Sequence, residues 1–131
     1  MAEGERIDLP RTLVNQLLHA AQLRPSQIHW GLISGRDGNP EHCHALNRSP
    51  QAAMHTVHAL RETLAQDREQ VWGLYCSGPG EISAPSPSEL ARLSVARFLG
   101  ISLGTKGVLQ LRGWRVVGAS FREMEVTIRE T

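Results

Sequence analysis

Apolar residues at helical spacing predict two helices in the first half of the chain. The first follows Pro10 and ends before Pro25. The second begins at Ser49-Pro50, a capping residue followed by a proline suited to the first turn, and runs to about residue 67. Apolar residues three and four positions apart line one side of each helix: Leu13, Val14, Leu17, Leu18 and Ala21 in the first, and Met54, Val57, Leu60 and Leu64 in the second.

Runs of apolar and β-branched residues between turn residues predict the strands. Residues 27–34 read as a buried strand, closed by a segment rich in turn residues, and the next strand should pair with it in antiparallel fashion. The full set of expected strands is 27–34, 41–46, 71–75, 101–103, 107–114 and about 120–128. This order of elements predicts one α+β domain over residues 1–131, with helices packed around a mixed, mostly antiparallel sheet.

The chain is organised around residues 71–89, VWGLYCSGPGEISAPSPSE. A short apolar strand ends at Cys76, and two glycines and a proline then turn the backbone. A proline-rich loop leads to a third helix, in which Ser86 suits the capping position, Pro87 the first helical position and Glu89 the third. Apolar residues continue this helix with near-helical spacing at Leu90, Leu93 and Phe98.

Composition narrows the function classes without naming one. The 131 residues are 40% hydrophobic and 21% charged, as in an ordinary globular protein, and carry a formal net charge of +1. The basic residues are scattered along the sequence and do not form the cluster typical of a nucleic-acid-binding surface. No apolar stretch approaches the roughly 20 residues that span a bilayer. The polar first residues do not resemble a secretory signal, so we expect a cytoplasmic protein with Cys43 and Cys76 as free thiols and no disulfide between them.

The stretch CSGPGEISAPSPSE resembles the signature of the JAMM/MPN (JAB) metalloproteases, in which His-x-His-Pro is followed by a short loop and Pro-Ser-x-x-Asp. Cys76 falls on the first histidine, Gly78 on the second and Glu89 on the aspartate; the outright matches are Pro79, Pro85 and Ser86. The resemblance covers most of the chain, as a pattern, from IDLPRTLVNQLLHAA to LQLRGWRVVGASFREMEV. It implies a JAMM/MPN-like, cytidine deaminase-like fold, with a sheet flanked by helices in this order.

The resemblance also implies what an active site would need. In the family, two histidines and a carboxylate hold a catalytic zinc, a glutamate from a neighbouring strand is the general base, and the helix-start serine stabilises the oxyanion. Here Gly78 has no side chain, and Ile28 occupies the position of the base, where an isoleucine favours packing over proton transfer. Cys76 is either a thiolate ligand or a small buried hydrophobe, and Glu89 is either a ligand or a helix cap. The degenerate positions are therefore Ile28, Cys76, Gly78, Ser86 and Glu89.

Other side chains offer weaker alternatives. His42 and His44 are two positions apart, so they could share one face of a strand, and His55 and His58 are neighbours on a helix surface. Neither pair has a third metal ligand that the sequence identifies, so both pairs are interpreted as polar surface. His29 reads as a hydrogen-bonded core histidine. A cysteine-protease reading pairs Cys76 with His29 or His44 as its base. Of the tryptophans, Trp72 is expected in the core and Trp114 is expected to be the most exposed.

The sequence therefore predicts a catalytically inactive JAMM/MPN-like pseudoprotease that binds a protein or peptide and needs no cofactor. The family acts on the C-termini of ubiquitin-like or sulfur-carrier proteins, which are the partners that the resemblance implies. The alternative is a divergent zinc peptidase or isopeptidase, with a variant metal site that uses Cys76, Glu89 and a histidine outside the motif. A purely structural subunit and a homodimer are also compatible with the sequence, whereas a nucleic-acid or membrane partner is not expected.

Overall fold

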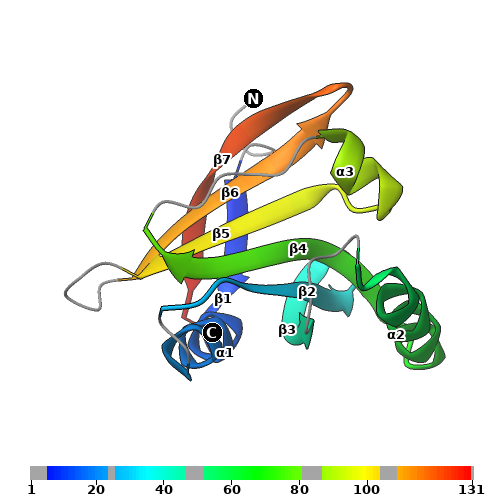
Figure 1. The fold of residues 1–131 in the computed structure, drawn as a ribbon, viewed down its shortest axis with the longest axis horizontal. Helices are drawn as coiled ribbons and strands as arrows, with labels where there is room; N and C mark the ends of the chain where they lie inside the picture. The colour runs from blue at the N-terminus through cyan, green and yellow to red at the C-terminus, as the bar shows by residue number, and fades with distance from the viewer. Residues whose placement is uncertain (1–5, 24–25, 47–51, 81–86, 104–108, 131) are drawn as a thin grey trace.

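The computed structural model describes residues 6–23, 26–46, 52–80, 87–103 and 109–130 (Figure 1). Within these residues, seven strands form one sheet and three helices pack on it. In chain order the elements are β1 (Arg6–Pro10), α1 (Arg11–Leu23), β2 (His29–Arg36), β3 (Asn39–Leu46), α2 (Met54–Gln66), β4 (Gln70–Pro79), α3 (Pro87–Arg92), β5 (Arg97–Leu103), β6 (Leu109–Val117) and β7 (Ser120–Arg129).

The sheet has the strand order β1-β7-β6-β5-β4-β2-β3. Two neighbouring pairs, β1 with β7 and β4 with β5, are parallel, and the other four are antiparallel. The expected mixed, mostly antiparallel sheet is therefore confirmed, as is the antiparallel β2–β3 pair. Asp37 and Gly38 join these two strands with positive φ angles of 55° and 77°, the backbone of a tight hairpin turn for which Asp-Gly is favoured.

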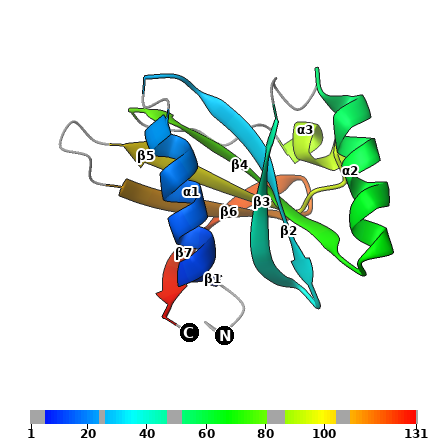
Figure 2. The same cartoon turned by 90° about the horizontal axis from the view of Figure 1, so that it is seen from below.

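Helices cover both faces of the curled sheet (Figure 2). The apolar side of α1 packs on one face, which we call the α1 face, with side chains from β1, β2, β4, β5 and β7. Helices α2 and α3 pack on the other face, which we call the α2/α3 face. No helix within the described ranges is long and apolar enough to cross a membrane.

Several expectations need correction. Residues 6–10 were not expected as a strand, but β1 pairs with β7 at the other end of the chain. Helix α3 ends at Arg92, and Phe98, expected on that helix, lies on β5 and is fully buried. Helix α2 begins at Met54, and the expected cap at Ser49-Pro50 lies outside the described residues.

The tryptophan predictions have mixed outcomes. Trp72 is buried, as expected. Trp114 is only 8% exposed, so the expectation that it would be the most exposed tryptophan is wrong. Its ring packs against Phe98, with centroids 5.5 Å apart, and the Arg112 guanidinium lies over it. The flanking arginines suggested exposure, but Arg112 instead covers the ring, because a guanidinium group stacks well on an indole.

Candidate functional site at the end of strand β4

Three of the motif positions, Ile28, Cys76 and Gly78, lie near the end of β4. On this strand Cys76 and Gly78 are two residues apart and therefore face the same side of the sheet. Cys76 lies opposite Trp30 of β2, and both belong to the core on the α2/α3 face. Strand β5 pairs in parallel on the other side, with Gly100 opposite Cys76 and Ser102 opposite Gly78.

Ile28 lies next to Gly78. A Cβ atom placed on Gly78 would be 3.1 Å from Cγ1 of Ile28. The Ile28 side chain is nevertheless 63% exposed, although the sequence predicts a buried strand over residues 27–34. The end of β4 therefore carries a bare backbone position beside an exposed apolar side chain.

Cys76 is part of the core. Its side chain is 3% exposed and packs with apolar residues of β2, β4 and β5. Burial raises the pKa of the Cys76 thiol to about 11, so the thiolate that binds zinc or attacks a carbonyl is scarce near neutral pH. The packed-hydrophobe interpretation of Cys76 thus agrees with its environment better than the ligand interpretation.

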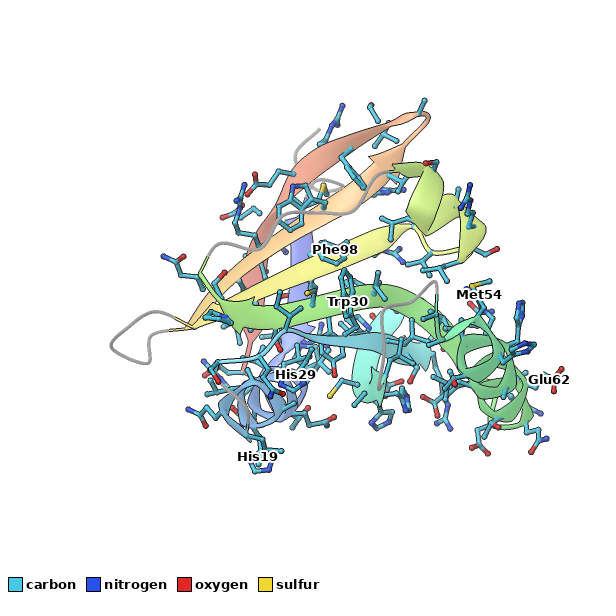
Figure 3. All side chains as sticks on the ribbon, in the orientation of Figure 1. His19, His29, Trp30, Met54, Glu62 and Phe98 are labelled. Atoms are coloured by element: carbon cyan, nitrogen blue, oxygen red, sulfur yellow. The ribbon has the colours of Figure 1, made fainter. Side chains whose placement is uncertain are left out.

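An aromatic row continues the same face across the sheet. Trp30 points across β4 toward Phe98, with ring centroids 6.3 Å apart, and Phe98 packs in turn against Trp114 (Figure 3). Phe98 is fully buried and Trp30 is half-buried. These rings pack in tilted arrangements and hold β2, β5 and β6 together on the face that carries Cys76.

The remaining motif positions are only partly described. Pro87 begins α3, as the sequence predicts. Ser86 lies outside the described residues, and so does the side chain of Glu89. Within the described part of the chain, no three residues of the types His, Cys, Asp and Glu are placed to hold a metal ion together. The Cys76, Gly78 and Ile28 positions do not fit a zinc centre of the family type, because one is buried, one has no side chain and one is apolar.

The histidines do not form a nucleophilic site with Cys76. His29 lies opposite Ser77, so it is on the α1 face, away from Cys76 (Figure 3). His29 is only half-buried, so the expectation of a core histidine is met in part. His55 and His58 are exposed on α2, as the polar-surface interpretation expects, and His42 is exposed on β3. Both cysteines are free, and they pack on opposite faces of the sheet, so no disulfide joins them.

One polar cluster was not predicted. Ser34 is fully buried, with its Oγ 2.7 Å from Nε2 of His44 and 3.1 Å from Oε1 of Glu69. With the hydroxyl donating to the carboxylate, His44 donates from Nε2, which sets the tautomer of a neutral ring. Burial lowers the pKa of His44, an effect that Glu69 opposes and His42 reinforces. The cluster ties β2 and β3 to the turn before β4. Ser34 is buried and therefore not accessible as a nucleophile. The sequence gave no signal for this cluster, because His44 and Glu69 lie 10 and 35 residues from Ser34 along the chain.

A cleft of about 660 Å³ lies away from these positions. It is open and polar, and its charged lining is mixed in sign, with Arg36 and Arg129 beside Asp37 and Glu41. None of the motif positions lines it.

Similarity to solved structures identifies the fold. The chain superposes on a JAB1/MPN domain protein from Archaeoglobus fulgidus with a TM-score of 0.56 and 16% identity, over 93% of this chain and 98% of that one. The fold is JAB1/MPN-like. Two further matches are solution structures of a protein from Desulfitobacterium hafniense (TM-score 0.69, 21% identity, 95% and 93% coverage) and of one from Salinibacter ruber (0.59, 18%, 93% and 90%). No protein-family model and no curated protein matches the chain.

Proposed function

We propose that this protein is a catalytically inactive JAB1/MPN-like domain that binds a protein or peptide tail at the end of β4. The observation that carries the proposal is that Ile28 lies next to Gly78, at the two positions that the motif alignment assigns to the general base and a zinc ligand. A glycine cannot coordinate a metal ion, and an isoleucine cannot take a proton from a bound water. The buried, protonated thiol of Cys76 adds to this argument.

The same residues support binding. Exposed large apolar side chains are few among the described residues, and Ile28 is one of them, at 63%. Beside it, the missing side chain at Gly78 allows another backbone to approach closely. Trp30, two residues from Ile28, is held against Phe98, which lowers the ordering cost of binding beside it. An extended tail with an apolar residue near its end is the kind of partner that suits such a surface, and the tails of ubiquitin-like or sulfur-carrier proteins belong to this class.

The test measures binding and cleavage in the same samples. Fluorescent peptides that carry the last residues of a ubiquitin-like and of a sulfur-carrier protein are titrated with the protein, with added zinc or with a chelator. We expect saturable binding to at least one tail, unchanged by the chelator, and no cleavage. Ile28→Asp should abolish this binding. Val117→Asp, which places the same charge at another exposed apolar position, should leave it intact.

Two outcomes contradict the proposal. Cleavage of either tail that chelation abolishes would show a working metal centre, as in the alternative with Cys76 and Glu89. Absence of binding, or equal loss in both aspartate variants, would remove the binding surface from the end of β4.

A gain-of-site variant tests the assignment of the motif positions themselves. The triple variant Ile28→Glu, Cys76→His and Gly78→His restores the family's base and both histidines. The substitutions at residues 28 and 78 belong together, because a side chain on Gly78 meets Ile28 at 3.1 Å. We expect this variant to take up one zinc ion in calorimetric titration and the wild type to take up none. A folded triple variant that binds no zinc would show that the alignment of these residues with the family motif is wrong.

A further inference from the structure

Arginines from adjacent strands lie side by side on the α1 face. In the sheet register Arg97 of β5 is opposite Arg115 of β6, and Arg115 is opposite Arg122 of β7. Each shares its face with residues of the α1-face core, because Leu99, Gly113 and Met124 lie two positions away on the same strands. The three residues form what we call the arginine row, at the end of the sheet where β4 and β5 begin and β6 ends (Figure 1).

The first member of the row is held in place. The Arg97 guanidinium lies 5.0 Å from the centroid of the Trp72 ring, and its Nη1 donates to the Trp72 carbonyl oxygen at 3.3 Å. Arg97 is half-buried, and burial lowers its pKa, with a further lowering from the positive charge of Arg115. A guanidinium fixed by a ring and a carbonyl loses little conformational freedom when it binds an anion.

The row is unusual because like charges directly opposite on neighbouring strands destabilise a sheet. Three other arginines have carboxylate partners: Arg11 with Glu130, Arg112 with Glu123 and Arg129 with Asp8. Neither Arg97 nor Arg115 has such a partner among the described residues. Arg115 is exposed, so its charge does not serve packing. A negatively charged partner would remove the repulsion between these two groups.

We propose that the arginine row binds an acidic peptide segment of a partner protein. One guanidinium on each of three adjacent strands spans about 10 Å, which suits a few neighbouring carboxylates. A nucleic acid fits less well. The indole of Trp72 beside the row is buried under Arg97 and gives no stacking platform for a base, and the chain's net charge is only +1.

The row is independent of the surface at the end of β4. Arg97 lies at the start of β5 on the α1 face, whereas Gly78 lies at the far end of β4 on the α2/α3 face. Failure of one proposal therefore leaves the other standing.

The test uses a fluorescein-labelled hexaglutamate peptide, followed by fluorescence anisotropy at about 50 mM salt, where surface charges are weakly screened. We expect saturable binding that weakens as salt is raised. Arg115→Gln should weaken it by about fivefold or more, as loss of one exposed charge-assisted contact would. Arg11→Gln removes the same charge from a site outside the row and should change the affinity by less than about twofold.

Stability separates a binding role from a structural one. Arg115→Gln should unfold at the same temperature as the wild type or higher, because it removes the like charge opposite Arg97. The proposal fails if no saturable binding is seen up to about 1 mM peptide, which corresponds to a very weak complex. It also fails if both glutamine variants lose affinity equally, or if hexathymidylate displaces the peptide at equal or lower concentration, since that would indicate a nucleic-acid surface.

Discussion

The chemical state of Cys76 decides between the binding interpretation and both enzyme alternatives, and its reactivity measures that state. With a pKa of about 11, only ~0.1% of the thiol is ionised at pH 8, roughly two hundredfold less than for an exposed cysteine of ordinary pKa. A thiolate of higher pKa is also more nucleophilic, which raises the rate constant of the thiolate in disulfide exchange by about a factor of ten. Ionisation alone therefore slows the reaction by roughly twentyfold.

Burial slows it further, because a side chain that is 3% exposed reacts only when the structure opens locally. We expect Cys76 in the folded protein to react with an aromatic disulfide reagent at least about a hundredfold more slowly than in guanidinium. The Cys43→Ser variant isolates Cys76, and release of the coloured thiolate is followed by absorbance. The Cys76→Ser variant reports the half-buried Cys43, which should react faster. A folded-state rate for Cys76 within about tenfold of its unfolded rate would refute the reasoning and favour a thiolate ligand or nucleophile.

Three further predictions concern stability. Because burial lowers the pKa of His44 in the folded protein, the unfolded chain binds a proton more readily. The free energy of unfolding should therefore decrease as the pH falls from about 7 to below the ordinary histidine pKa. His44→Gln should make this decrease smaller in urea titrations at several pH values. Gly31→Ala should cost about 2–3 kcal/mol, because its Cβ would overlap the buried Tyr75 ring, whereas Gly38→Ala, with open space around it, should cost less. Phe98→Ala should cost about 3–5 kcal/mol in the same titrations, since it leaves a cavity in the aromatic row.

Local patterns were sufficient for much of the fold. Helix α1 and the β2–β3 hairpin follow from apolar periodicity and the turn residues between them, which are short-range signals. Strand β1 was missed because it is five residues long, ends in a proline and depends on pairing with β7, more than a hundred residues away. Phe98 was placed on the wrong element because a single apolar residue at a helical interval is equally suited to a buried strand.

The candidate site was predictable in its parts but not in its environment. The spacing of Cys76 and Gly78 on a strand places them on one face, and the structure brings Ile28 next to Gly78. The exposure of Ile28 could not be read from the sequence, since it depends on where β2 begins relative to β4. The arginine row has no sequence signal either, because its members come from three strands and meet only through the sheet register.

The two proposed surfaces differ in what the fold itself requires of them. At the end of β4, stability alone can account for a buried thiol and a glycine, since neither carries the cost of burying an imidazole that has no metal. At the arginine row, by contrast, the like charges of Arg97 and Arg115 lie directly opposite one another, which costs stability, so the sheet would be more stable without this pair. Arg115 therefore carries the stronger evidence of a role outside folding, whereas the surface at Ile28 depends on the exposure of an apolar side chain that folding leaves unburied.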